Sequence, residues 1–394
     1  MAEVREKLWN ANYVKLNFSN FMLFLSFYLI VPLLPVYMSE TFHSNKDVIG
    51  MVLSGFTVTA LLIRPFSGYI VDSYSRKKVL LICYFLFFLF FAGYLAATTL
   101  LAFAIARTVH GAPFGASTVS NSTVAIDSLP SSRRTEGIGY YGLSNNVAMA
   151  LGPSAGMWIY QFSNNFSLLF WASLIAAGIG FALNCTVQTK FRVKPEKTKK
   201  LSADRFFLFK GWLLGIVMVT MSFAFGIVTT YLAIYGKEEL GITTGTSGFF
   251  VLLAVGLIMS RLIGSRTLRK GMVVFNCSVG VTLSLCGYLL FASNQSLFGY
   301  YGAALIIGLG NGHMFPAMQS MFLNLADNSK RGTANATLLT SWDVGIGLGI
   351  VLGGVVSEHF GYIAAFYLAF VVNALGVATF FLSGRQYYLR NKVR

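Results

Sequence analysis

The sequence predicts an all-α membrane protein with 12 transmembrane helices in two six-helix, pseudo-symmetric halves. Hydrophobic residues make up 55% of the chain and charged residues only 11%, whereas a soluble domain usually carries about 25% charged residues. The apolar runs are continuous rather than alternating, which favours helices over a β-barrel. Two arginines and four glycines recur 197 positions later in a chain of 394 residues. This offset indicates an internal duplication.

The duplication is clearest in the glycines. Of the seven glycines between Gly111 and Gly156, four find another glycine 197 positions on. The recurring residues are Arg64, Arg134, Gly111, Gly115, Gly152 and Gly156, with counterparts at Arg261, Arg331, Gly308, Gly312, Gly349 and Gly353.

Each element of the prediction is an apolar run of roughly the 20 residues that a helix needs to cross a bilayer. The third and fourth runs nearly touch. In order, the runs are Leu16–Tyr37, Val48–Ile70, Val79–Thr98, Leu100–Leu129, Ile138–Gln161, Ser167–Gln188, Gly211–Tyr235, Ser247–Ser265, Gly271–Ala292, Leu297–Leu325, Ala334–Ser357 and Tyr362–Leu382.

The basic residues predict the orientation. The net charge is +16, but of the 30 basic residues only Lys46 and Lys237 fall in loops on the outer side. This positive-inside pattern places both termini in the cytoplasm and the chain in the inner (plasma) membrane. It argues against a nucleic-acid partner, which would require basic residues on one folded face. We expect an N-terminal half at 1–190, a cytoplasmic linker at 191–210 and a C-terminal half at 211–394.

A loop motif lies between the second and third runs. The segment GYIVDSYSRKK, from Gly68 to Lys78, resembles the GxxxDxxGRK motif of the major facilitator superfamily, with Ser75 in place of its second glycine. The resemblance implies a cytoplasmic gate built from Gly68, Asp72, Arg76 and Lys77 that latches the outward-facing state. Glycine allows close helix packing, and a carboxylate can bind helix N-termini.

Two further motifs extend the resemblance. Arg107 to Gly111 (RTVHG) is similar to the family's RxxxG element. Ala148 to Gly156 (AMALGPSAG) is similar to the GxxxGPxxG element of its exporters, here carried by Gly152, Pro153 and Gly156. The resemblance implies the 12-helix drug or metabolite:proton antiporter branch. As packing features, the same glycines and proline would kink the helix and admit a close neighbour.

Ionisable residues inside the apolar runs are few, and a charge there usually faces a cavity or a partner. We expect Asp343 to exchange protons and substrate, although it could instead be a polar group bonded to a neighbouring helix. Arg107 is expected to pair with charge in the cavity or to couple to protons, although it could also snorkel to an interface. His110 and His313 could either titrate or be hydrogen-bonded structural residues. Asp127 and Glu136 flank the basic loop Arg133–Arg134 and are interpreted as cytoplasmic interface pairs, not as a proton path.

Amide and aromatic side chains could line a central cavity around these charges. Those selected as candidates are Tyr28, Asn145, Asn146, Tyr231, Asn311 and Trp342. For any one aromatic residue, lipid contact or core packing is the competing explanation.

The sequence contains no nucleotide-binding, hydrolase or metal-site motif, so we expect no cofactor, no metal and no enzymatic activity. We predict a monomeric secondary transporter, surrounded by the lipid bilayer, with protons and a small molecule as partners. The expected function is proton-coupled efflux of an amphiphilic drug-like compound. One alternative is export of a zwitterionic or anionic metabolite, such as a sugar or an opine-type metallophore. Another is a membrane sensor or scaffold on a transporter-like fold.

Overall fold

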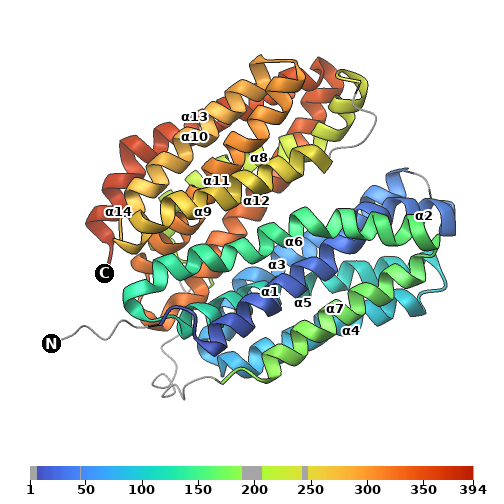
Figure 1. Cartoon of the computed structure of the whole chain (residues 1–394), viewed down its shortest axis with the longest axis horizontal. Coiled ribbons are helices and arrows are strands. Elements are labelled where there is room, and N and C mark those ends of the chain that lie inside the picture. The colour runs from blue at the N-terminus through green and yellow to red at the C-terminus, as the bar shows by residue number, and fades with distance from the viewer. Residues whose placement is uncertain (1–6, 45, 189–205, 242–246, 394) are drawn as a thin grey trace. The chain divides into compact units, whose positions relative to one another are not determined.

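The computed structural model describes residues 7–44, 46–188, 206–241 and 247–393, and within them it contains helices and no strand (Figure 1). The chain forms two compact units. Unit 1 comprises Met1–Gly137, Ser144–Phe206 and Ser329–Ala336; unit 2 comprises Ile138–Leu143, Phe207–Asn328 and Thr337–Arg394. Each unit thus includes a short stretch from the other part of the chain, Ser329–Ala336 in unit 1 and Ile138–Leu143 in unit 2. The division into halves at 1–190 and 211–394 stays a prediction. Most of the predicted linker lies outside the described residues.

In the N-terminal part of the chain, the described residues form seven α-helices. They are α1 (Ala11–Ile30), α2 (Leu34–Phe42), α3 (Lys46–Ser73), α4 (Arg76–Ala96), α5 (Leu100–Ser128), α6 (Arg134–Ser163) and α7 (Phe166–Cys185), with 3-10 turns at Val31–Leu33 and Ser131–Arg133. Helix α1 begins five residues before the first predicted run, because Asn10 caps it by accepting from the backbone N–H of Tyr13 at 2.9 Å. The run then continues into α2 through the 3-10 turn.

The C-terminal part of the chain also contains seven described α-helices. They are α8 (Trp212–Glu238), α9 (Ser247–Arg269), α10 (Val273–Ser293), α11 (Leu297–Leu325), α12 (Arg331–Phe360), α13 (Tyr362–Thr379) and α14 (Arg385–Asn391). Two 3-10 turns, Phe209–Gly211 and Asn328–Lys330, precede α8 and α12. A π-helical turn at Phe380–Gly384 joins α13 to α14.

The duplication extends to helix bounds and packing. The bounds of α4, α5 and α6, shifted by 197 residues, are those of α10, α11 and α12. The packed pairs also repeat: α3 with α5 and α1 with α7 correspond to α9 with α11 and α8 with α13. A Cβ on Gly111 would overlap the carbonyl of Phe56, and a Cβ on Gly308 would overlap that of Leu253. Phe56 and Leu253 are themselves 197 residues apart, so the same close helix crossing occurs twice.

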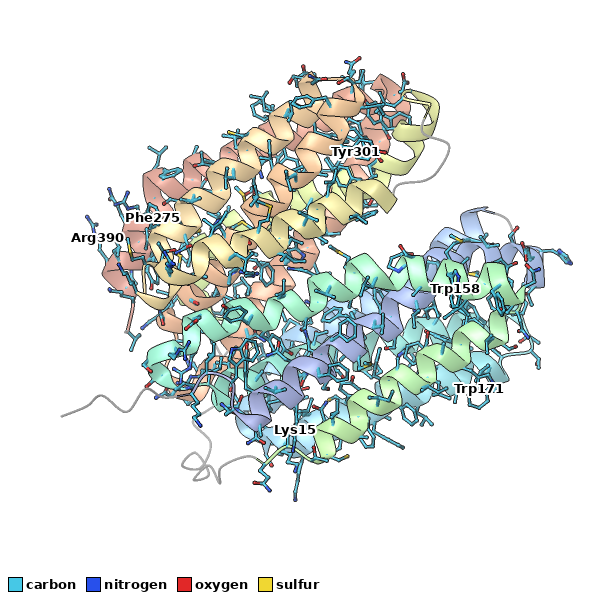
Figure 2. All side chains as sticks on the ribbon, viewed as in Figure 1. Lys15, Trp158, Trp171, Phe275, Tyr301 and Arg390 are labelled. Atoms are coloured by element: carbon cyan, nitrogen blue, oxygen red, sulfur yellow. The ribbon has the colours of Figure 1, made fainter. Side chains whose placement is uncertain are left out.

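Eight of the described helices are long and apolar enough to cross a membrane. Helices α5 and α11 fall below that threshold; they are largely buried against neighbouring helices, so they need less apolar surface. Large apolar side chains point outward elsewhere. Trp158, Trp171 and Phe275 lie on outer faces of their bundles (Figure 2), with 67%, 51% and 51% of their surface exposed. Such exposure suits a lipid environment.

Candidate functional site

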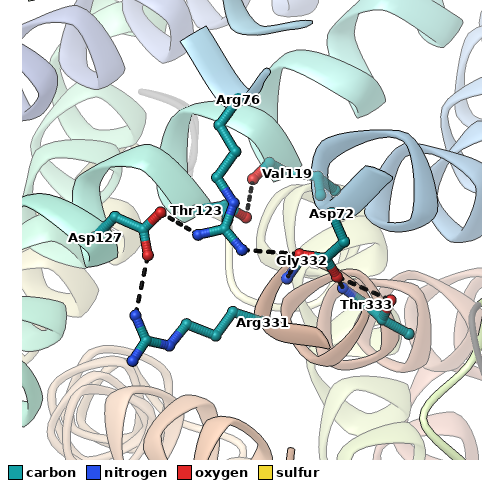
Figure 3. A network of polar contacts seen from close by, with 8 residues as sticks. All are labelled: Asp72, Arg76, Val119, Thr123, Asp127, Arg331, Gly332 and Thr333. Atoms are coloured by element: carbon teal, nitrogen blue, oxygen red, sulfur yellow. Dashed lines mark hydrogen bonds and ion pairs between the residues drawn. The ribbon is translucent and has the colours of Figure 1, made fainter. Parts of the chain in front are cut away.

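The carboxylate of Asp72, at the end of α3, binds the first turn of α12 (Figure 3). It accepts hydrogen bonds from the backbone N–H of Gly332 at 3.0 Å, the N–H of Thr333 at 2.9 Å and the hydroxyl of Thr333 at 3.1 Å. These N–H groups have no partner within their own helix, and the positive end of the helix dipole favours an anion. Asp72 therefore acts as an N-terminal cap supplied by another helix.

Asp72 is the first of four charges of alternating sign (Figure 3). Arg76 donates to Asp72 at 2.9 Å and also to Asp127, which in turn accepts from Arg331 at 3.0 Å. Asp127 thus pairs with Arg76 and Arg331, two partners that the sequence did not name. Glu136 does bind Arg133, at 3.0 and 3.1 Å. The missed signal was that Asp127 ends one helix at the same end of the bundle where Arg76 begins another.

Gly68 allows α3 and α12 to approach closely at this network. A Cβ on Gly68 would lie 2.7 Å from the Cβ of Ala336 and 2.9 Å from the carbonyl oxygen of Gly332. Either distance is too short for a real contact. Glycine at position 68 therefore places Asp72, one helical turn later, within reach of the N-terminus of α12.

Lys77 lies apart from the carboxylates of the network. Its ammonium donates to the carbonyls of Cys185 at 3.1 Å and Val187 at 2.5 Å, and Lys15 donates to Thr186 at 3.1 Å. These carbonyls end α7 and lack helical partners, and cations are favourable at a helix C-terminus. The structure thus places Lys77 as a cap on α7. Its role in the gate stays a prediction.

The glycines of the exporter-like motif pack α6 against α1. A Cβ on Gly152 would lie 2.5 Å from the Cβ of Tyr28, and one on Gly156 would overlap the carbonyl of Leu29. Pro153 lies inside α6 between them. This geometry supports the close packing expected of these residues.

Arg107 and His110 are brought together by Tyr94, which the sequence did not single out. Arg107 donates to the hydroxyl of Tyr94 at 3.2 Å, and that hydroxyl lies 2.6 Å from Nδ1 of His110. The Arg107 guanidinium carbon lies 4.0 Å from the ring centroid of Phe56 and 5.7 Å from that of Phe27, within the range of a cation–π interaction. All five side chains belong to unit 1.

Asp343 lies at mid-length in α12 and is half-buried. Its neighbour Trp342 packs against the rings of Phe225 and Phe315, with centroids 5.6 and 5.4 Å apart. One turn after Asp343, a Cβ on Gly347 would meet no described atom within 4 Å. Open space therefore lies beside Gly347, whereas a Cβ on Gly345 would overlap Ser222 and the carbonyl of Val219.

The remaining candidates are distributed over both units. Tyr231 donates from α8 to the carbonyl of Ile350 in α12 at 2.6 Å. Asn311 accepts from Ser284 at 3.4 Å. His313 lies 3.4 Å from Asn276, measured from Nδ1 to Oδ1.

Asn145 and Asn146 are half-buried in α6, and the side-chain oxygen of Asn145 has no hydrogen-bond partner among the described residues. Arg107 and Asp343 lie in different units, so a cavity shared by the two stays a prediction. Among the residues that the structure describes, no group of three or more His, Cys, Asp or Glu could hold a metal ion.

The fold and the Asp72 network define a class: a multi-helix membrane protein built from a duplicated bundle, with a charged network at a helix N-terminus. The chain belongs to the Major Facilitator Superfamily, whose family model matches residues 16–326 and 269–392. Its members are transporters, and efflux proteins are among the relatives of this chain.

Two relatives come from Staphylococcus aureus (strain Mu50 / ATCC 700699). The Staphylopine export protein is 26% identical over 346 residues, covering 81% of this chain and 83% of the relative. The Quinolone resistance protein NorA is 23% identical over 384 residues, covering 92% and 94%.

Two solved structures share the fold. The human organic anion transporter MFSD10 (TETRAN) has a TM-score of 0.83 at 17% identity, covering 94% of this chain and 98% of its own. The transporter FucP, in the outward conformation, has a TM-score of 0.75 at 16% identity, covering 95% and 98%.

Proposed function

We propose that this protein is a monomeric, proton-coupled exporter of small amphiphilic compounds that works by alternating access in the cytoplasmic (plasma) membrane. We propose 12 spans, counting α1–α2 and α13–α14 as one span each, with both termini in the cytoplasm. The positive-inside pattern of the loops supports this orientation. Efflux proteins among the relatives support the direction of transport.

The observation that carries the proposal is the cap that Asp72 provides to α12. One carboxylate accepts three hydrogen bonds from the first turn of this helix. These bonds join residues about 260 positions apart in the chain and involve no covalent link. An alternating-access cycle needs such a contact, strong enough to hold one state and able to release for the other.

Asp343 is proposed as the proton-coupling residue. It lies within an apolar helix, where a charged side chain is costly to bury in the membrane. Protonation removes that cost, so the carboxyl can cross between states when neutral. One proton moving through 100 mV releases about 2.3 kcal/mol, which can sustain roughly a fiftyfold gradient of one electroneutral substrate per proton.

The second candidate function is export of a zwitterionic or anionic metabolite. The relative named as a staphylopine export protein favours it, and so does a buried arginine, Arg107, in the first unit. A membrane sensor or scaffold remains the alternative from another class. It would bind a ligand without moving it.

Transport by purified protein in proteoliposomes with an imposed pH gradient tests the proposal. We expect ethidium, a cationic amphiphile, to move against its gradient with the wild-type protein. Asp343→Asn should abolish gradient-driven movement and leave the thermal unfolding midpoint within a few degrees. Asp327→Asn, an exposed acid in the loop before α12, is the matched control and should transport normally.

Wild-type-like transport by Asp343→Asn would overturn the assignment of that residue. If the wild-type protein bound solutes without moving any of them, the sensor or scaffold alternative would replace the transporter proposal.

A further inference from the structure

Arg107 is a buried cation without a buried anion. Only 4% of its surface is exposed. Its one hydrogen bond in the described part of the chain goes to the neutral hydroxyl of Tyr94, and its Nε is buried with no partner there. A guanidinium has five N–H donors, and burying them unsatisfied is costly. The geometry therefore leaves strong donors available inside the bundle.

Among the residues that the structure describes, the helices whose side chains contact Arg107, and its own helix, supply no carboxylate close to it. Helices α1 and α4 contain no Asp or Glu, and the one acid of α5, Asp127, lies 20 residues further on. Helix α3 carries acids at positions 47 and 72. These positions are nine residues before and 16 residues after Phe56, on the order of 13 and 24 Å along the helix.

Tyr94 and His110 orient the guanidinium. Arginine can only donate, so the hydroxyl oxygen of Tyr94 accepts from Arg107. The Tyr94 oxygen also lies 2.6 Å from Nδ1 of His110, where the donor and acceptor roles depend on the tautomer of His110. In either tautomer this second contact fixes the position of the Tyr94 oxygen.

The rings beside Arg107 form a flat, apolar surface. Phe56 lies over the guanidinium, and Phe27 stacks on both Phe56 and Phe114 with centroids 5.2 and 4.7 Å apart. Of the three side chains that contact the guanidinium, Phe56 and Tyr94 are buried and only Phe27 is partly exposed. Phe27 therefore marks the side from which a ligand would reach Arg107.

We propose that Arg107 binds a carboxylate of the exported compound, and that this compound carries its carboxylate beside a flat apolar group. This inference rests on the proposed transport function and names its substrate class. A carboxylate matches the planar donors of arginine and can accept two of them at once. Phe27 and Phe56 would pack against the flat group, and Tyr94 is the positioning residue for Arg107.

A matched pair of ligands tests the proposed carboxylate site by binding alone, without an imposed pH gradient. The probes are a 4-quinolone-3-carboxylic acid and the same quinolone with a neutral carboxamide, titrated into purified protein by calorimetry. We expect the wild-type protein to bind the acid more tightly by about tenfold to a hundredfold, the range of a hydrogen-bonded charge. Arg107→Gln should bring the ratio of the two affinities near one, and Arg107→Lys should restore part of it.

The role of Tyr94 in positioning Arg107 is tested with its own control variant. Tyr94→Phe should reduce the acid-to-amide ratio several-fold. Tyr84→Phe, which removes a hydroxyl buried in the same helix and bonded to the carbonyl of Ser19, should leave the ratio unchanged. A merely structural effect would weaken both ligands together. Equal affinity of the wild-type protein for acid and amide, or an unchanged ratio in Arg107→Gln, would overturn the proposal.

Ethidium transport separates this inference from the proposed function, because ethidium has no carboxylate. If the wild-type protein pumps ethidium but does not distinguish acid from amide, the transporter proposal stands and the carboxylate site fails. If it distinguishes the two ligands but moves no solute under a pH gradient, the site stands and the transport function fails.

Discussion

At the residue scale, the most informative side chain is Asp72, because it serves two partners at once. It neutralises Arg76 and it caps α12. Hydrogen bonds to an ionised acceptor are roughly twice as strong as neutral ones. The charge of Asp72 thus contributes both to the network and to the strength of the cap.

We expect Asp72→Asn to slow transport by about tenfold or more, since each charge-assisted bond contributes about 1.5–3 kcal/mol. The amide keeps the shape of the side chain and loses its charge. Initial rates of ethidium movement in proteoliposomes measure the effect, with Asp327→Asn again as control. An unchanged rate would show that the cap is structural only.

At the element scale, the helices pack through glycines that recur at the 197-residue offset. A Cβ on Gly308 in α11 would overlap the backbone of α9. A Cβ on Gly302, six residues earlier, would make only ordinary van der Waals contacts. The two glycines lie in the same helix, so they form a matched pair for testing the crossing.

Gly308→Ala should destabilise the protein by about 1–3 kcal/mol, the usual cost of overpacking against a rigid neighbour. Gly302→Ala should be neutral or stabilising by up to about 1 kcal/mol, because alanine is the better helix former. Thermal unfolding midpoints in detergent compare the two variants. Equal midpoints would mean that α9 and α11 can separate without cost.

The second element-scale feature is the cationic cap on α7. Lys77→Gln should cost about 1 kcal/mol and speed amide exchange in the last turn of α7, because the carbonyls there lose a charged donor. Hydrogen-exchange mass spectrometry measures this. Lys78→Gln is the control, since Lys78 is adjacent and exposed. Similar exchange in both variants would contradict the cap.

At the scale of the whole molecule, the distribution of basic residues predicts the orientation in the membrane. Both termini should be cytoplasmic, so green fluorescent protein fused after Arg394 should fluoresce in bacterial cells, and alkaline phosphatase fused at the same place should be inactive. The opposite pattern in whole-cell assays would mean that the positive-inside distribution does not control insertion.

The sequence predicted the helical elements well where the signal is local. The third and fourth runs, which nearly touch in the sequence, form two distinct helices. Thr99 ends the gap between them by capping α5, where it accepts from the N–H of Ala102 at 3.2 Å. Helix boundaries of this kind depend on a few adjacent residues. The close crossing at Gly111 could also be inferred, because a recurring glycine in a membrane helix usually marks a helix contact.

The partners of the candidate site could not be predicted in the same way. The partners of Asp127, Arg76 and Arg331, were not named, and Tyr94 was not recognised between Arg107 and His110. In both cases the deciding contact comes from another helix, and helical periodicity shows which residues share a face but not which helix packs against it.

By itself, the sequence determined the class of protein, the duplication and the run of helices, since these depend on apolar length, charge distribution and a fixed offset. Only the tertiary structure decided the contacts: Asp72 with α12, Lys77 with α7 and Arg107 with Tyr94. The physical reason is the separation along the chain of the residues that each feature depends on. Burial in lipid is encoded residue by residue, whereas a hydrogen bond between helices requires a meeting of side chains that are distant in the chain.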